Sequence, residues 1–196
     1  MSFGRMYTTS FFASPGPGSR RREMGEPLSD YERALKASAW RREHPDEKFP
    51  SWADLNGANL AGVDLSWADL NGAHLSRANL RGASLFRANL EDADLSGADL
   101  YEADLRGVDL SRANLREAYL HDADLSWATL YGANFSWADL YRANLYDAHF
   151  QEANLYGAKL REVDLTGANL TGVDLHGVDL GDWEIGPDGI VRAKEP

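Results

Sequence analysis

From residue 51 to residue 180 the chain repeats a five-residue pattern of apolar and polar positions 26 times, without an insertion or deletion. The fifth position of each unit is Leu, or Phe at Phe135 and Phe150, and the third is Ala or Val. The fourth is usually Asp or Asn, and the first two vary. A period of five fits neither the 3.6-residue period of a helix nor the alternation of a strand. It predicts a chain that turns a corner every five residues, with its apolar side chains inward.

Four such five-residue sides would close a coil of 20 residues, and stacked coils would pair through backbone hydrogen bonds about 4.8 Å apart. The units resemble the pattern A-[DN]-L-x-x of the pentapeptide-repeat family, and this resemblance covers 130 of the 196 residues. The resemblance implies an all-β fold, a right-handed quadrilateral parallel β-helix. It also implies that the Leu/Phe and Ala/Val positions face inward and the other three positions face outward. We therefore expect a solenoid over residues 51–185.

The corners of this solenoid are expected to favour glycine. Gly is frequent at the second position of the unit, as at Gly57 and Gly107. A corner that needs a positive φ selects Gly, because Gly alone enters that region without steric cost. Units with a bulky residue at the second position, such as those of Trp127 and Arg142, are expected to turn differently.

The residues before the repeats are expected to cap the solenoid, because an uncapped end exposes core and unpaired strand edges. The sequence Ser29-Asp30-Tyr31-Glu32 matches a capping box and predicts a helix from Asp30 to Glu43 that stops at Pro45. Residues 27–50 would form this N-terminal helical cap. The side chains expected over the first coil are Leu28, Leu35, Trp40 and Phe49.

Residues 186–196 are expected to form a C-terminal cap or tail, with a turn at Pro187-Asp188-Gly189. The apolar side chains expected to seal this end are Trp183, Ile185, Ile190 and Val191. At the other end, residues 1–26 carry four Arg, clustered Ser, Pro and Gly, and no acid before Glu23. This composition is typical of a disordered tail. A start of the chain at Met24 and organelle targeting by residues 1–22 are alternatives, and we expect targeting the least.

Composition limits the chemistry of the chain. It has no Cys, which excludes disulfides and thiolate metal sites, and no apolar run near the roughly 18 residues of a membrane span. The net charge is −11, and residues 51–180 hold 20 acidic against nine basic residues. Such a surface keeps a protein dispersed and disfavours direct binding of nucleic acid. We expect a protein of the bacterial cytoplasm that binds no membrane.

No catalytic, cofactor or metal site is expected. Of the five histidines, four fall within the repeats on three different sides of the coil, so they do not meet at ligand spacing. The acids recur at the solvent-facing position of the unit, and no phosphate-binding glycine loop or nucleophile elbow is present. The chain is therefore predicted not to be an enzyme.

Two groups of surface side chains are candidates for an interaction site. Steps of 20 residues align one column, in which cations and rings could stack on each other: Arg81, Tyr101, His121, Tyr141 and Arg161. A belt of aromatics girds about one and a half coils, and aromatics are enriched in binding hot spots: Trp127, Tyr131, Trp137, Tyr141, Tyr146 and Tyr156. The alternative role for both groups is support of the coil.

A third candidate surface is acidic. Asp64, Asp104, Asp124 and Asp164 recur on one side of the coil. A rod of six and a half coils would be about 31 Å long, a length of B-DNA that carries about 18 phosphates. The 20 acids of the repeats match that gross charge. Members of the pentapeptide-repeat family that protect DNA gyrase do so as acidic, DNA-like rods.

The leading hypothesis is a non-catalytic protein–protein interaction module, a monomer or weak end-to-end dimer, whose partner the sequence does not identify. The alternative is an acidic DNA mimic that binds DNA gyrase or another type II topoisomerase, in the manner of quinolone-resistance proteins. Two features disfavour the alternative: the repeats contain no inserted loop, and no C-terminal dimerisation helix follows them.

Overall fold

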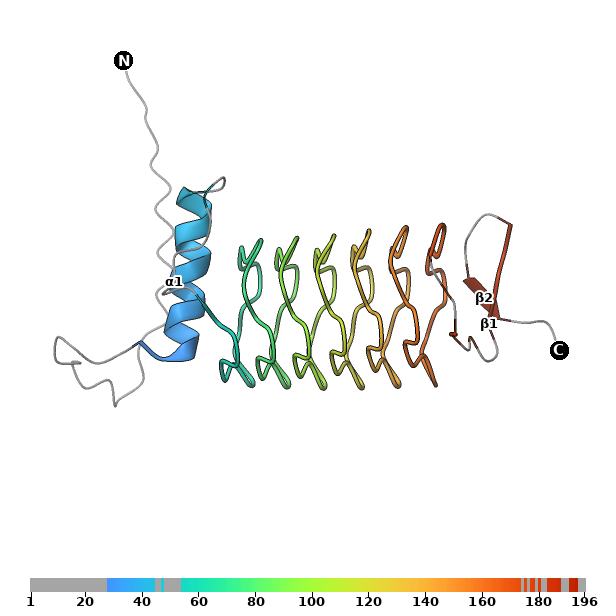
Figure 1. Ribbon diagram of the computed structural model, residues 1–196, viewed down its shortest axis with the longest axis horizontal. Coiled ribbons are helices and arrows are strands. Elements are labelled where there is room, and N and C mark those ends of the chain that lie inside the picture. The colour runs from blue at the N-terminus through green and yellow to red at the C-terminus, as the bar shows by residue number, and fades with distance from the viewer. Residues whose placement is uncertain are drawn as a thin grey trace, which may run out of the picture.

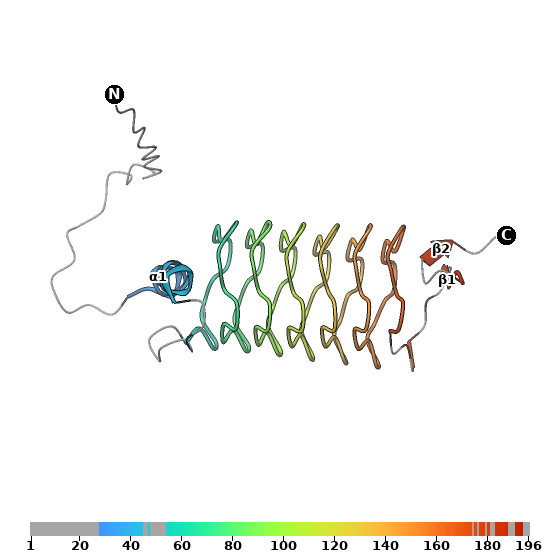
Figure 2. The same ribbon diagram turned by 90° about the horizontal axis from the view of Figure 1, so that it is seen from above.

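The chain winds into a stack of similar coils with a helix at one end and a small sheet at the other (Figures 1 and 2). The helix is α1 (Asp30–Glu43), and β1 (Trp183–Ile185) pairs with β2 (Val191–Ala193) in an antiparallel sheet. This computed structural model describes residues 28–44, 47, 54–173, 175, 177–178, 180, 183–187 and 191–193. The predicted tail 1–26, Pro45, Phe49, His176, Ile190 and the Asp188-Gly189 part of the predicted turn lie outside these residues.

Each coil holds 20 residues. Parallel backbone bridges join residues 20 apart, from Asn59 with Asn79 through to His149 with Asn169. The bridges are isolated and do not form strands. In each five-residue side two residues form a turn, and only one residue is bridged to the adjacent coil. Hydrogen bonds about every second residue connect successive coils; Leu60 N–H, for example, donates to the Asn79 carbonyl over 2.7 Å.

The core consists of the third and fifth positions of the units. The Leu and Phe side chains at the fifth position, from Leu55 to Leu170, are 0–4% exposed, and the Ala at the third position are buried as well. Phe135 and Phe150 are both fully buried, with ring centroids 5.7 Å apart. The predicted inward orientation is confirmed. At about 1.5–3 kcal/mol for each large apolar side chain, this burial is the main term that favours the coil.

All corners have the same backbone conformation, so the prediction that bulky units turn differently is wrong. The second position has a positive φ in every unit from Gly57 to Gly177, and fourteen of these residues are not glycine. Trp127 and Arg142 have φ of 58° and 57°, only a few degrees below the 60–76° of the glycines.

The conformation is imposed by the stack. Ala128 N–H donates to the Leu125 carbonyl over 3.0 Å, which closes a β-turn with positive φ at its third residue, as in type II. Trp127 N–H donates in turn to the Tyr146 carbonyl of the next coil over 2.9 Å. A different turn would break that bond and shift the register of the core. The strain of about 1–2 kcal/mol for a non-glycine residue is therefore tolerated.

The helix α1 closes the first coil with polar side chains that replace a preceding coil. In the stack, Asn79 N–H donates to the Ala58 carbonyl one coil earlier. The first coil has no such neighbour, and there Asn59 N–H donates to Asp30 Oδ2 over 2.7 Å and Asp69 N–H to Ser38 Oγ over 2.9 Å. The predicted capping box is present, with Glu32 N–H donating to the Ser29 hydroxyl over 3.2 Å.

The side chains that α1 packs on the coil differ from those predicted. Leu28 and Leu35 are 41% and 44% exposed, whereas Ala34 and Ala37 are fully buried. Small residues let the helix backbone approach the end of the coil closely enough for the hydrogen bonds of Asp30 and Ser38. Trp40 is half-buried and stacks on His44, with ring centroids 4.6 Å apart.

The sheet of β1 and β2 lies at the last coil. Val191 is 2% exposed, and its N–H donates to the Ala168 carbonyl over 2.9 Å, so β2 pairs with the coil as a further turn would. Trp183 is half-buried against the core. Nowhere in the described parts of the chain is there a helix with the length and apolar character needed to cross a membrane.

Candidate interaction site on one corner of the solenoid

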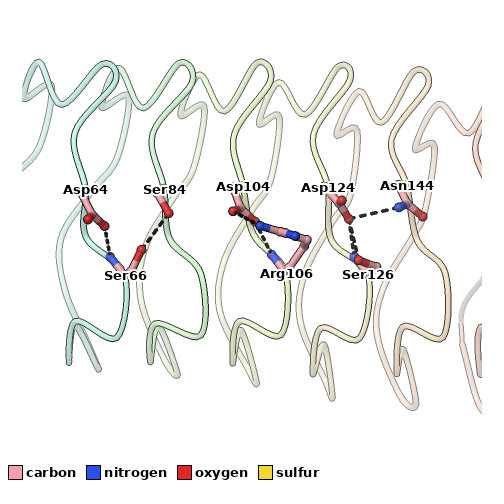
Figure 3. Close-up of polar contacts among 8 residues, drawn as sticks. All are labelled: Asp64, Ser66, Ser84, Asp104, Arg106, Asp124, Ser126 and Asn144. Atoms are coloured by element: carbon pink, nitrogen blue, oxygen red, sulfur yellow. Dashed lines mark hydrogen bonds and ion pairs between the residues drawn. The ribbon is translucent and has the colours of Figure 1, made fainter.

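The acidic column lies along one side of the solenoid as the 20-residue period predicts. Asp64, Asp104, Asp124 and Asp164 share the column with two neutral residues, Ser84 and Asn144, and successive members are bridged partners. Figure 3 shows the column from Asp64 to Asn144. The column is therefore not continuously acidic.

Each carboxylate of this column supports the corner that follows it. Oδ1 of Asp64 accepts from Ser66 N–H over 2.9 Å, and Oδ1 of Asp124 accepts from Ser126 N–H over 3.0 Å (Figure 3). Asn144 makes the same contact through its amide oxygen, at 3.0 Å from Tyr146 N. This is an Asx turn, which explains why the fourth position of the unit is Asp or Asn.

The charges of the column are not equally available. Arg106 donates two hydrogen bonds to Asp104, from Nε to Oδ1 over 2.8 Å and from Nη2 to Oδ2 over 2.7 Å (Figure 3). The Arg106 side chain lowers the pKa of Asp104 through these bonds. Asp124 and Asp164 make no ion pair with any other described residue. Asp64 makes none either, so among the described residues one acid of the column is paired with a cation and three are not.

The corner next to this column carries two similar aromatic pairs; we call it the aromatic corner (Trp67, Phe86, Arg87, Arg106, Trp127 and Tyr146). In the first pair, Trp67 and Phe86 meet edge to face with centroids 5.8 Å apart. The Arg87 guanidinium lies 5.2 Å from the Trp67 centroid and 5.5 Å from that of Phe86, and the Arg106 guanidinium lies 5.4 Å from Phe86. Two cations of the chain itself therefore contact this pair.

The second pair is Trp127 with Tyr146, again edge to face with centroids 5.8 Å apart. Trp127 is 57% exposed. A groove of about 500 Å³ lies beside this pair, and the predicted residues Asp124, Asp164, Trp127 and Tyr146 meet there. Its other lining residues are Arg106, Ser126 and Asn144. The structure thus brings part of the acidic column and part of the aromatic belt into one site.

The rest of the belt lies elsewhere. Trp137 meets Tyr156 edge to face at 5.2 Å on another corner, half a coil away in sequence. Its ring packs on the backbone of Gly157, where an added Cβ would lie 2.7 Å from the ring. Trp137 thus contributes to packing between coils. Tyr131 donates from its hydroxyl to Glu152 over 2.6 Å.

This packing predicts that Gly157→Ala destabilises the chain more than Gly57→Ala. Both glycines have positive φ, of 67° and 64°, so each substitution should cost about 1–2 kcal/mol of backbone strain. A Cβ at Gly57 would meet nothing within 4 Å, whereas one at Gly157 would displace the Trp137 ring. Urea denaturation followed by circular dichroism gives the two free energies of unfolding. Equal losses would contradict the packing role of Trp137.

The predicted column of cations and rings stacks only in part. The Arg81 guanidinium lies 4.3 Å from the Tyr101 centroid, and His121 meets Tyr141 at 5.7 Å. No stacking contact joins Tyr101 to His121 or involves Arg161 in this described part of the chain. The Tyr141 hydroxyl donates to Glu162 over 3.1 Å, and this hydrogen bond raises the pKa of Tyr141. The column is thus largely engaged with its own neighbours.

The histidines and acids form no metal site within the part of the chain that the structure describes. Nε2 of His121 lies 3.0 Å from Oδ1 of Asp139 without the geometry of a hydrogen bond, and Lys159 donates to the other oxygen over 2.8 Å. Asp139 and Lys159 thus form an ion pair beside His121.

The reasoning from sequence missed Phe86, Arg87 and Arg106. A signal for Phe86 exists in the described solenoid, where each exposed Trp is followed by an aromatic residue at the first position of the unit one coil later. The pairs are Trp67 with Phe86, Trp127 with Tyr146, and Trp137 with Tyr156.

Solved structures similar to this chain include pentapeptide repeat proteins from two organisms. One from Nostoc is 41% identical, covering 56% of this chain and 84% of its own, with a TM-score of 0.41. HetL from Nostoc, involved in heterocyst differentiation regulation, is 36% identical, covering 71% and 74%, with a TM-score of 0.27. One from the Arabidopsis thaliana thylakoid lumen is 31% identical, covering 62% and 71%, with a TM-score of 0.35.

Among curated proteins none matches the sequence. The family model for pentapeptide repeats matches in eight copies, whose ranges together span residues 51–182. That span includes every coil of the solenoid, the acidic column and all three Trp pairs. The chain therefore belongs to the pentapeptide-repeat family.

Proposed function

We propose that this chain is a non-catalytic protein-interaction module, built on a right-handed quadrilateral β-helix, which binds a protein partner at the Trp127 and Tyr146 pair. One observation carries the proposal: Trp127, which is 57% exposed, and Tyr146 line a groove of about 500 Å³ together with Asp124 and Asp164. Exposed Trp and Tyr are the residues most enriched in binding hot spots.

The absence of catalysis in this proposal has general support. Pentapeptide-repeat proteins are generally structural or interaction modules. The acids that line the groove support turns: Oδ1 of Asp124 accepts from the Ser126 N–H over 3.0 Å and from the Ser126 hydroxyl over 2.7 Å, and no histidine is among the lining residues to act as a base. We also propose that the protein acts in the bacterial cytoplasm, as a monomer or weak end-to-end dimer.

The excess of acid in the repeats favours a second candidate, a DNA mimic that binds gyrase or another type II topoisomerase. The pairing of the acids weakens it, because about a third of the acids in the repeats have a cation beside them. The ion pairs at or below 3.3 Å include Asp92 and Glu91 with Arg112, Asp99 with Arg81, Asp104 with Arg106, Asp122 with Arg142, and Asp139 with Lys159.

Partner capture by matched variants tests the proposed site. The immobilised protein should retain a partner that a Trp127→Ala, Tyr146→Ala double variant loses and a Trp137→Ala, Tyr156→Ala double variant keeps. Each change removes one edge-to-face pair, and Trp137 also packs on Gly157, so a loss of coil support would affect the control variant at least as strongly. Equal retention by both would overturn the proposed site.

A supercoiling assay tests the second candidate. We expect no inhibition of gyrase by the native protein. Inhibition that is lost in an Asp104→Asn, Asp124→Asn, Asp164→Asn variant would favour the DNA mimic, since Asn keeps the Asx turns and removes three charges. We expect such a loss of inhibition to be tenfold or more, and each factor of ten corresponds to about 1.4 kcal/mol of binding free energy.

A further inference from the structure

We infer that the Trp127 and Tyr146 pair is a binding site for an arginine side chain of the partner protein. The inference rests on the proposed function and names the group that the site takes. The chain itself contains the precedent, because its other pair on the same corner, Trp67 with Phe86, is contacted by the guanidinium groups of Arg87 and Arg106.

The two pairs are geometric copies. In both, a Trp at the second position of a unit meets an aromatic ring at the first position of the unit one coil later, and the centroids are 5.8 Å apart in each. The interplanar angles are 86° and 81°. Both Trp have positive φ, of 61° at Trp67 and 58° at Trp127. A ligand that fits the faces and edges of the first pair therefore fits those of the second.

The two pairs differ in what lies next to them. At the second pair, the positions that correspond to Arg87 and Arg106 are occupied by Asp147 and Thr166. The chain thus supplies no guanidinium from these positions to Trp127 and Tyr146. Arg106 also lines the groove, but its Nε and Nη2 are hydrogen bonded to Asp104.

Two carboxylates line the groove beside the Trp127 and Tyr146 pair, where they can pair with a bound cation. Asp124 and Asp164 line the groove and form no ion pair with another residue that the structure describes. Oδ1 of each accepts the backbone N–H two residues on, so its other oxygen, Oδ2, has no hydrogen bond within the described part of the chain. A guanidinium can stack on an aromatic ring and donate to a carboxylate at the same time, whereas an ammonium is a compact point charge. The geometry therefore favours Arg over Lys.

The third pair is a built-in control. Trp137 and Tyr156 have the same edge-to-face arrangement, but the residues that correspond to Asp124 and Asp147 are Asn134 and Gly157. Trp137 packs on Gly157, so the two pairs differ both in the acid at the position of Asp124 and in access to the Trp ring. A shift at Trp127 and none at Trp137 would locate binding at the groove, and the Asn variants of Asp124 and Asp164 test the role of the acids.

The test follows the Trp indole N–H signals of the full-length ¹⁵N-labelled protein during titration with the peptide acetyl-Gly-Arg-Gly-amide. Trp→Phe variants assign the signals of Trp127 and Trp137. We expect a saturable shift at Trp127 and none at Trp137, with a dissociation constant in the range of about 1–10 mM for one side chain. The citrulline peptide, which has the same shape without charge, should cause no saturable shift, and the lysine peptide should bind at least about threefold more weakly.

Matched variants separate local from general electrostatics. Asp124→Asn with Asp164→Asn should weaken arginine binding at least about fivefold. Asp69→Asn with Asp109→Asn removes the same charge from the fourth position on another side of the coil and should leave binding within about twofold. Both double variants keep the Asx turns of their corners, since Asn fills the fourth position in many units.

Three outcomes would overturn the inference: no saturable shift at Trp127, an equal shift at Trp137, or equal affinities of the two Asn variants. Each is distinguishable from failure of the proposed function. If partner capture depends on Trp127 but arginine does not bind, only the arginine inference is wrong. If arginine binds and capture ignores Trp127, the site is real but the proposed role in partner binding is wrong.

Discussion

Leu115→Lys is expected to lower the free energy of unfolding by roughly 4 kcal/mol or more, and the variant should be partly unfolded at 37 °C. Leu115 is fully buried, in a column of core side chains one coil after Leu95 and one coil before Phe135. The substitution removes apolar burial and places an ammonium among side chains that offer it no acceptor. Urea denaturation followed by circular dichroism measures the loss.

Arg112→Lys is the control for Leu115→Lys from the same part of the rod. Arg112 is exposed and forms ion pairs with Glu91 over 2.7 Å and Asp92 over 2.8 Å. Lys cannot reproduce the two-pronged contact with Asp92, but exposed ion pairs contribute little. We expect a loss below about 1 kcal/mol. Losses of equal size in the two variants would contradict the assignment of Leu115 to the core.

The core could be predicted from the sequence because its signal repeats. In every unit Ala or Val stands two residues before the Leu or Phe, so the same two positions face inward throughout. Leu115 is buried as this pattern predicts. The conformation of the corners could not be predicted from single units. Glycine at Gly57 indicated positive φ, yet Trp127 and Arg142 adopt it too, because hydrogen bonds between coils impose one turn on every unit.

The candidate site was predicted only in part, because the repeat fixes the columns of residues but not the contacts between their side chains. The 20-residue period placed Asp64, Asp104, Asp124 and Asp164 in one column. It could not show that Arg106 neutralises Asp104, which depends on the direction of a long side chain. The sequence placed Trp127 and Tyr146 in one belt but could not show that their rings meet, because the two residues occupy different positions of their units and their side chains lean from one coil to the next.

The cap shows a third limit of sequence patterns. Apolarity favoured Leu28 and Leu35 as the contact of α1 with the coil, but the contact is made by Ala34, Ala37 and Ser38. A helix that must hydrogen-bond to the open end of a coil needs small residues on that face. The large apolar side chains of the helix therefore do not show which of its faces caps the coil. That face is identified by its hydrogen bonds to backbone N–H groups of the first coil.

Removal of residues 1–48 is accordingly expected to destabilise the solenoid and cause self-association. It deletes α1 and with it the hydrogen bonds from Asn59 N–H to Asp30, from Asp69 N–H to Ser38, and from Arg33 to the Asp54 carbonyl over 2.8 Å. Three such bonds are worth roughly 3 kcal/mol, before the lost burial of Ala34 and Ala37. The open backbone groups of the first coil would then pair with another chain.

Thermal melts and light scattering measure both effects, and a chain that begins at Met24 is the control. The composition of residues 1–23 gives them little to bury, so this shorter removal should leave the melt unchanged. A Ser38→Ala variant should lose about 1 kcal/mol without aggregation, since one bond is lost and α1 remains in place. If the chain without residues 1–48 stayed monomeric and melted like the full-length protein, α1 would not be the cap, and the end of the coil would close by itself.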